Sequence, residues 1–261
     1  MTPNAKPDKD FPYWLLLVAG LGLWLFYRVL ADDLYAQVLG VLARGIGVTV
    51  MVTLVAYAGA CVIGLGLALG GLSRFIWLRQ GVRFYIEVMR GVPIIVLLLY
   101  VAFAGVPLLI EGVNRLGWTG VTTRDFPLLW RAVIALMLAY SAFLAEIFRA
   151  GLQAVDRGQV EAACALGLSG WQRFRHVVFP QAFRLILPPL GNDFVAMVKD
   201  SSLVSVLGVG DVTQLGKVTA AGNFRYFETY NVVALIYLTM TIGLSLVLRR
   251  VEARLRGKSE R

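Results

Sequence analysis

Apolar residues dominate six long segments of the chain, and polar residues gather between them. The segments span about residues 12–31, 45–72, 91–110, 128–149, 181–209 and 229–248. The second segment carries no charged residue from Gly45 to Leu72, and its Gly66 and Gly70 have the spacing of closely packed membrane helices. About 20 apolar residues cross the hydrocarbon core of a bilayer. The pattern therefore predicts an all-α polytopic membrane protein with about six transmembrane helices.

Composition excludes a water-soluble enzyme. Hydrophobic residues make up 58% of the chain, charged residues 16%, and the mean hydropathy is +0.72, whereas soluble domains carry about 25% charged residues. The net charge of +9 does not indicate nucleic-acid binding, because the basic residues lie between apolar segments. If both termini are cytoplasmic, 17 of the 25 basic residues fall on the cytoplasmic side. The positive-inside rule therefore predicts cytoplasmic termini and contacts with anionic lipid.

The N-terminal apolar segment is expected to remain in the protein as a helix. Residues 1–10 are polar and contain two acidic residues beside two lysines. A cleaved signal peptide has a basic start, a shorter apolar run and a small-residue cleavage site. We therefore count the segment at 12–31 as the first transmembrane helix.

The fifth segment is the only strongly interrupted one. Pro188 and Pro189 lie near its start, and these prolines and the later serines (201, 202 and 205) are expected to loosen the helix. Polar side chains follow at membrane depth: Asn192, Asp193, Lys199, Asp200, Ser201 and Ser202. Asp193 and Asp200 are two helical turns apart and share one face, about 10 Å apart along the axis. Two interpretations stay open: Lys199 and Asp200 form an internal ion pair, or the segment lines a path for a charged or zwitterionic solute. Other polar residues are expected at the membrane interfaces: Tyr57, Glu87, Arg131 and Glu146.

The chain lacks the motifs of common enzyme sites. No G-x-x-x-x-G-K-[ST] loop occurs, so this chain has no such phosphate cradle for ATP. His176 is the only histidine, and no histidine cluster can hold a metal ion. We therefore expect no catalytic residues and no cofactor on this chain.

The loop between the fourth and fifth segments has its own structure signals. Glu161 to Leu166 are good helix formers, and Gly167 fits the C-terminal cap of that helix. Ser169 is placed to cap a second helix over 170–178, which should end before Pro180. Small side chains, Ala162 and Ala163, are expected to expose a flat surface on the first helix. An ordinary amphipathic connector is the alternative.

The same loop resembles a known signature. Permease subunits of ATP-binding-cassette (ABC) importers carry E-A-A-x-x-x-G-x9-I-x-L-P, and this chain has Glu161, Ala162, Ala163, Gly167 and Pro180 in register. Conservative replacements stand at the Ile and Leu positions: Val177 and Phe179. Further stretches resemble the polar amino acid branch of these permeases: 85–93, 145–151, 158–161, 180–184 and 199–203. The resemblance covers about residues 45–250, and the helix at 12–31 departs from the five-span pattern of many members.

The resemblance implies a type I ABC importer transmembrane fold in a bacterial inner membrane. It divides the chain into an N-terminal segment with an extra helix (1–44), a permease core (45–250) whose signature loop spans 158–180, and a basic cytoplasmic tail (251–261). The implied partners are a cytoplasmic ATPase dimer, a second permease subunit (identical or paralogous) and a periplasmic amino-acid-binding protein. ATP and magnesium belong to the ATPase. Nucleic acid is not an expected partner.

The resemblance also assigns roles to residues. Four loop residues would dock on the ATPase: Glu161, Ala162, Ala163 and Gly167. Four residues of the fifth segment would line the substrate pathway at the membrane midplane: Asp193, Lys199, Asp200 and Ser202. The expected function is ATP-driven import of polar amino acids. There are two alternatives. The first is a secondary carrier or channel without an ATPase, which the ATPase-type loop disfavours. The second is a membrane scaffold that anchors an ATPase, which the charged residues in the fifth segment disfavour.

Overall fold

The computed structural model describes residues 13–256 except 118, 119 and 121, and all regular structure in these residues is helical. Eleven α-helices are formed: α1 (Tyr13–Ala31), α2 (Asp33–Gly71), α3 (Ile76–Gly91), α4 (Ile94–Tyr100), α5 (Val106–Arg115), α6 (Leu128–Gln153), α7 (Arg157–Ala165), α8 (Gly170–Arg173), α9 (Phe179–Asp200), α10 (Val212–Asn223) and α11 (Tyr226–Arg256). Shorter helical segments join them: η1 (Val101–Gly105, π-helical), η2 (Phe174–Val178, π-helical) and η3 (Ser201–Leu207, 3₁₀). The predicted all-α class is confirmed.

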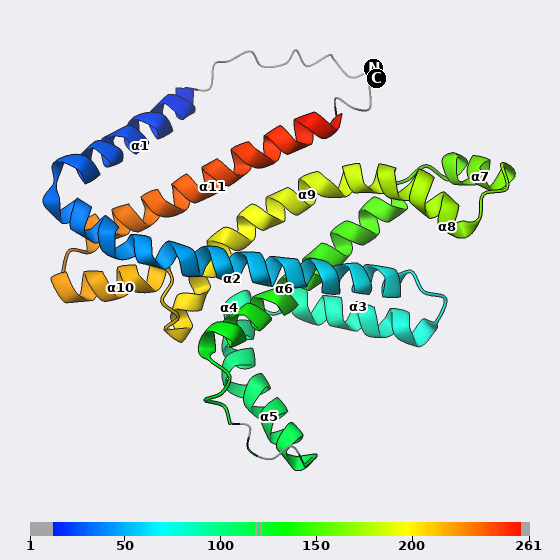
Figure 1. The fold of residues 1–261 in the computed structure, drawn as a ribbon, viewed down its shortest axis with the longest axis horizontal. Coiled ribbons are helices and arrows are strands. Elements are labelled where there is room, and N and C mark those ends of the chain that lie inside the picture. The colour runs from blue at the N-terminus through cyan, green and yellow to red at the C-terminus, as the bar shows by residue number, and fades with distance from the viewer. Residues whose placement is uncertain (1–12, 118–119, 121, 257–261) are drawn as a thin grey trace.

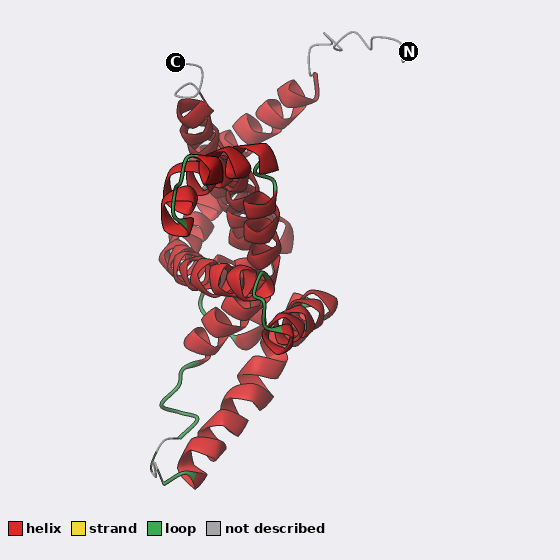
Figure 2. Ribbon diagram, turned by 90° about the vertical axis from the view of Figure 1, so that its right-hand side faces the viewer, coloured by secondary structure: helices red, strands yellow, loops and turns green. Residues whose placement is uncertain are grey.

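The helices are arranged around a long central pair. Figure 1 shows α2 running along the molecule, with α6 crossing beside it and α3 alongside its C-terminal half. The short helices α7 and α8 lie at one end, and α10 lies near the other. Figure 2, turned by 90°, shows α5 extending away from the remaining helices, as it does in Figure 1. The loop with the signature and the N-terminal part of α10 are therefore far apart.

Small residues bring α2 and α6 together. Buried residues recur every four positions along α2: Ala56, Ala60, Gly64 and Ala68. A Cβ on Gly64 would lie 3.0 Å from the backbone oxygen of Ser141 in α6, so the two helices are in close contact there. Gly66 faces open space instead, so the expected glycine pair does not form this contact. The tight interface is typical of membrane helices, whose packing relies on small residues.

Four helical stretches in the described residues are long and apolar enough to cross a membrane: Asp33–Gly71, Ile94–Arg115, Leu128–Gln153 and Tyr226–Arg254. Helices α1 and α9 occupy the other two predicted segments but are not among these four, so the count of six is not confirmed. Helix α2 also starts earlier than the predicted boundary at residue 45, because Asp32 caps it by accepting a hydrogen bond from the Leu34 backbone amide at 3.0 Å. The polar N-terminus and residues 257–261 of the basic tail lie outside the described residues.

Arg131, expected near a membrane interface, is buried in protein close to the start of α6. Its side chain is only 7% exposed in the first turn of α6. The guanidinium donates hydrogen bonds to the carbonyl oxygens of Phe126 and Ala102, both at 2.8 Å, and to that of Thr123. Ala102 lies in the π-helical turn of η1. Arg131 thus ties the connection before α6 to the middle of the span formed by α4, η1 and α5.

The fifth segment is interrupted at its serines, as expected, but not at its prolines. Pro188 and Pro189 are inside α9, which continues through them to Asp200. The α-helix ends only where η3 begins, and the 3₁₀ segment ends at Gly208, whose φ of +74° lies in the left-handed region that favours glycine. Tyr57 of α2 donates a hydrogen bond to the Leu190 carbonyl oxygen at 2.6 Å, next to the prolines. This bond joins α9 to α2 just beyond the prolines.

Candidate functional site

Local interactions define α7 in the signature loop. Asp156 caps the helix by accepting a hydrogen bond from the Gln159 backbone amide at 3.2 Å, so the helix begins four residues before the predicted Glu161. At the C-terminus of the helix, the backbone N–H of Gly167 donates a hydrogen bond to the Cys164 carbonyl oxygen at 2.9 Å. The backbone N–H of Leu168 donates one to the Ala163 carbonyl oxygen at 3.1 Å. This is a Schellman cap, and Gly167 has the required positive φ of +73°. The predicted cap role of Gly167 is confirmed.

The proposed docking residues do not all face outward. Glu161, Ala162 and Gly167 are exposed. Ala163 is only 4% exposed, so the expectation that it contributes to a flat exposed surface is wrong. Its side chain lies on the face of α7 turned toward the rest of the chain, where α7 approaches η2. A surface that receives a partner at this helix is therefore formed around Glu161, Ala162 and Gly167.

The second helix of the loop does not end before Pro180. Ser169 and Gln172 form a reciprocal capping box that starts α8, as the sequence predicts. The chain then continues through η2 directly into α9, because Pro180 occupies the first turn of α9, where a missing amide proton costs little. A ladder of aromatic rings follows this path at 5.9 Å spacing: Trp171, Phe174, Phe179 and Phe183. The loop is therefore joined to α9 without a break.

The candidate pathway residues lie where α9 faces α6. Tyr140 of α6 donates a hydrogen bond to the Asp200 carboxylate at 2.7 Å. Asp193 is also close enough to Tyr140 to interact with it electrostatically, and both carboxylates are half-buried. The prediction that the two acids share one face of the helix is thus consistent with their common neighbour. This face carries two half-buried carboxylates, and the buried Tyr140 hydroxyl group holds that of Asp200.

Lys199 and Asp200 do not form the ion pair considered as an alternative. Among the described residues Lys199 takes part in no ion pair, its side chain is exposed, and the partner of Asp200 is Tyr140. Ser202 is half-buried in η3, whereas Ser201 is buried and donates to the Val198 carbonyl oxygen at 2.7 Å. Asp193, Asp200 and Ser202 thus lie at the partly buried end of α9, and Lys199 points away from it.

Two tyrosines near the acids were not identified from the sequence. Tyr140 is buried in α6, and Tyr57, expected at an interface, packs its ring against Phe194 at 4.8 Å between centroids. A tyrosine inside an apolar span needs a partner for its hydroxyl group, and this is the signal that points to both residues. Neither partner could be named, because both bonds join residues far apart in sequence.

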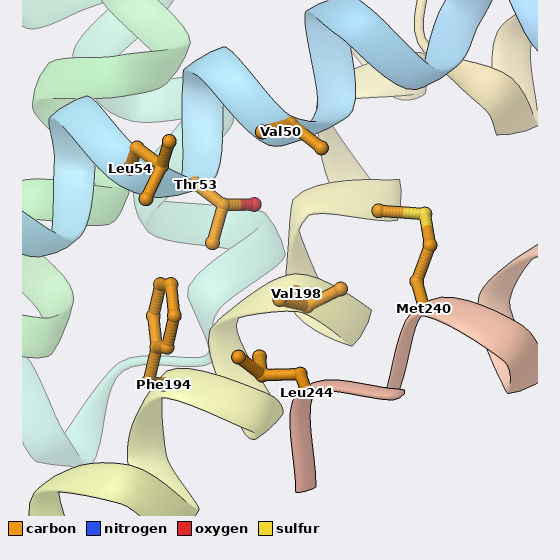
Figure 3. Close-up of a pocket in the computed structure, with 7 residues that line it drawn as sticks. All are labelled: Val50, Thr53, Leu54, Phe194, Val198, Met240 and Leu244. Carbon is orange, nitrogen blue, oxygen red and sulfur yellow. The ribbon is translucent and has the colours of Figure 1, made fainter. Parts of the chain in front are cut away.

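An apolar cavity of about 320 Å³ lies on another side of α9. Figure 3 shows its lining side chains from α2, α9 and α11: Val50, Thr53, Leu54, Phe194, Val198, Met240 and Leu244. Thr53 provides the only side-chain oxygen, and its hydroxyl donates to the Thr49 carbonyl oxygen of its own helix. The cavity therefore offers no group that would bind a charged solute, in contrast to the face with Asp193 and Asp200.

The sequence profile of one protein family, described as the binding-protein-dependent transport system inner membrane component, matches residues 60–257. The chain belongs to this family. The matched range contains the signature loop and both acids of α9. Family membership confirms the predicted transport subunit: the chain is a multi-pass permease of the inner membrane, not an enzyme, and ATP hydrolysis takes place on a separate subunit. It gives no support to a secondary carrier.

Individual relatives agree with this assignment. The permease is 37% identical over 218 residues to the glutamine transport system permease protein GlnP of Escherichia coli K12, covering 82% of this chain and 93% of GlnP. It is 33% identical over 217 residues to the arginine transport system permease protein ArtQ of Bacillus subtilis, covering 82% of this chain and 92% of ArtQ.

Solved structures confirm the type I importer fold. The crystal structure of an amino acid ABC transporter with histidines matches the permease with a TM-score of 0.71 and 36% identity, over 86% of this chain and 97% of the other. The inward-facing methionine transporter MetNI matches with a TM-score of 0.64 over 82% and 96% of the two chains. Its identity of 21% supports the shared fold alone.

Proposed function

We propose that this permease imports polar amino acids and that Asp193 and Asp200 line the path they take. The observation that carries the proposal is the pair of half-buried acids beside the Tyr140 hydroxyl group, at the end of α9. Relatives named for glutamine and arginine transport support amino acids as the substrate class. Every α-amino acid carries an ammonium group, and a carboxylate with a neighbouring hydroxyl group offers it charge-assisted hydrogen bonds.

The path needs polar groups because the surrounding helices are apolar. A charged group at the centre of a bilayer costs at least about 2.5–3.5 kcal/mol when it is not paired. Half-buried acids lower this cost for a passing ammonium group, and they remain partly hydrated when no solute is present. Ser202, half-buried in η3, is placed to add a neutral hydrogen-bonding group next to Asp200. Lys199 is exposed and, if it contacts substrate, meets it outside the face shared by the acids.

ATP hydrolysis is coupled to this path through α7. In the proposal, Glu161, Ala162 and Gly167 form the exposed surface that enters a cleft of the ATPase, and buried Ala163 supports the helix from below. The route from α8 to the acids is continuous, because α8, η2 and α9 follow one another without a loop, and residues 166–169 join α7 to α8. A displacement of α7 by the ATPase would therefore move α9 and its carboxylates.

The proposed assembly contains two permease subunits, identical or paralogous, with an ATPase dimer at the cytoplasmic side and an amino-acid-binding protein at the opposite side. Both termini are then cytoplasmic, as the distribution of basic residues predicts. Reporter fusions at residues 5 and 258 test this orientation. Two cytoplasmic signals are expected, and a periplasmic signal at residue 5 would mean that α1 does not span the membrane.

Transport by the purified complex tests the function directly. Tagging this chain and identifying the co-purified subunits by mass spectrometry defines the complex, which is then reconstituted in proteoliposomes with the binding protein. Labelled glutamine, arginine and histidine are offered one at a time, with ATP on the ATPase side. Uptake of at least one amino acid that stops in an ATPase-dead complex is the expected result. Uptake that survives the dead ATPase would instead establish a secondary carrier.

A further inference from the structure

A second cavity, which has charged residues in its lining, lies between α2, α3 and α6, away from the acids of α9. Its volume is about 280 Å³. Val82, Ile86 and Ala145 are buried side chains that form its apolar wall. Four charged side chains complete the lining: Arg83 and Glu87 from α3, and Glu146 and Arg149 from α6. The lining therefore brings together two positive and two negative groups, with Arg83 and Glu87 exposed and Glu146 and Arg149 partly buried.

The charges of this cavity are only partly used by the protein itself. Arg149 bonds Glu146 at 2.6 Å through one terminal nitrogen, while its Nε is buried without a hydrogen-bond partner. Arg83 and Glu87 are four residues apart on α3, yet neither forms an ion pair in the part of the chain that the structure describes. A buried guanidinium N–H without an acceptor is costly. The cavity thus offers charges of both signs, those of Arg83 and Glu87, that no ion pair among the described residues uses.

We propose that this cavity is an inhibitory site for an α-amino acid on the cytoplasmic side of the permease. A carboxylate would accept hydrogen bonds from Arg83 and from a terminal nitrogen of Arg149, because guanidinium groups suit a carboxylate. The α-ammonium group would bind Glu87. An inorganic anion or a metal ion satisfies only one half of this lining and is repelled by the other. A zwitterion satisfies both.

The position of the cavity explains why binding there would inhibit transport. Arg149 lies in the last turns of α6, four residues before the helix ends and the chain enters the loop that carries α7. Figure 1 shows α3 and the adjoining ends of α2 and α6 on the side of the molecule where α7 and α8 lie. An amino acid bridging α3 and α6 would hold α6 in one position relative to α3. Accumulated product would thereby slow the movement of the coupling loop. This inference rests on the proposed function, which sets the substrate class and the cytoplasmic side.

The test uses the complete complex in proteoliposomes with the ATPase facing outward, so that the outer medium is the cytoplasmic side. The binding protein and its amino acid are enclosed, and ATP hydrolysis is measured while glutamine, arginine or histidine is added to the medium. We expect at least one of them to reduce the rate to less than half. Glu87→Gln and Arg149→Gln should each raise the concentration for half-inhibition at least tenfold. Arg79→Gln, on the same helix but outside the cavity lining, should leave that concentration within twofold.

Several outcomes would overturn the site. The first is a wild-type complex whose ATP hydrolysis none of the three amino acids inhibits. The second is an unchanged half-inhibition concentration in both cavity variants. The third is relief of inhibition by Asp200→Asn alone. Glu87→Gln keeps the test valid even if Arg149→Gln fails to assemble, because Glu87 forms no ion pair with any described residue that the substitution would break. Amino acid uptake into vesicles with the ATPase facing inward separates the two proposals. No uptake contradicts the proposed function. Uptake in these vesicles, with no inhibition of ATP hydrolysis in the outward-facing ones, contradicts only this site.

Discussion

The α7–α8 loop and the junction of α9 with η3 carry the two sets of candidate residues, and different interactions hold them in place. In the loop the defining bonds are local: Asp156 caps α7, and Ser169 caps α8, each through a residue three positions away. At the junction the defining bonds join distant parts of the chain. Tyr140 and Asp200 are 60 residues apart, and Tyr57 and Leu190 are 133 residues apart.

This difference teaches where a substitution will be felt. A change in the loop alters one short helix and the surface it presents, while the membrane bundle stays intact. A change at the junction removes a contact between two packed helices, and its effect depends on whether the group also meets a solute. The two regions can therefore be separated by measuring protein level, ATPase association and uptake on the same variants.

Asp200→Asn should give the largest effect. The amide keeps the volume and can still accept the Tyr140 hydrogen bond, so protein level should hold. Uptake and substrate-stimulated ATPase activity should fall about 10- to 100-fold, because a hydrogen bond to a charged group contributes about 1.5–3 kcal/mol. Glu111→Gln, which removes an acid from exposed α5, is the matched control and should change uptake less than twofold. Cysteines introduced at positions 193 and 200 can be labelled with a hydrophilic thiol reagent. Labelling that substrate does not alter would contradict the pathway role.

Gly167→Asp should give the second largest effect and a different signature. A residue with a Cβ in the left-handed region costs roughly 1–2 kcal/mol, and the added charge faces the proposed ATPase surface. ATPase association and uptake should fall about 5- to 30-fold, while membrane insertion is unchanged. Gly167→Asn, which tolerates this backbone conformation, should lose less. Gly170→Asp adds the same charge at the start of α8, and an equal loss in that control would show that charge, not the helix bend, is responsible.

Tyr140→Phe should reduce uptake by a few-fold. It removes one hydrogen bond to Asp200, worth about 0.5–1.5 kcal/mol, and leaves the carboxylate in place. Tyr85→Phe provides the control, since the Tyr85 hydroxyl contacts Ser141 on the same helix but lies away from both acids. Both variants should lose similar thermal stability. Uptake that falls equally in the two variants would assign Tyr140 a packing role only.

Ser169→Ala should give the smallest effect. It removes the capping box of α8 and costs about 1 kcal/mol of local helix stability. Helix α8 leads directly into η2 and α9, which keep it in place, so uptake should fall less than threefold. Hydrogen exchange of the α8 amides should nevertheless speed up. Unchanged exchange would show that the aromatic ladder from Trp171 to Phe183, rather than the cap, holds this segment.

Features with a local cause could be predicted from the sequence. The left-handed Gly167 and the Ser169 cap follow from residue type and short-range geometry, and the structure has both. The helical class follows from apolar segments that are too long for strands in a bilayer. The family resemblance rested on the same loop, where several fixed positions lie within 20 residues.

Features that depend on packing between distant parts of the chain could not be predicted from the sequence. Both the prolines and the serines of the fifth segment were expected to loosen the helix, yet α9 continues through Pro188 and Pro189 and ends only at the serines, where η3 begins. The sequence also did not show that the Arg131 guanidinium is held by the carbonyl oxygens of Phe126 and Ala102. Ala163 was expected on the surface because its size suits one, while its position in the folded loop turns it inward. Each error concerns which neighbour a residue meets.

The length of α2 sets how the two ends of the molecule can influence each other. Its 39 residues extend roughly 58 Å, about twice the thickness of the hydrocarbon core. The helix contacts α10 around Gly45 and Thr49 and contacts α3 around Gly70, and no break interrupts it between them. The stretch from Gly45 to Gly70 is roughly 38 Å long, so a tilt of about 5° displaces its α3 end by roughly 3 Å. Small rearrangements beside α10 would then reach α3 as movements of about half a helical turn.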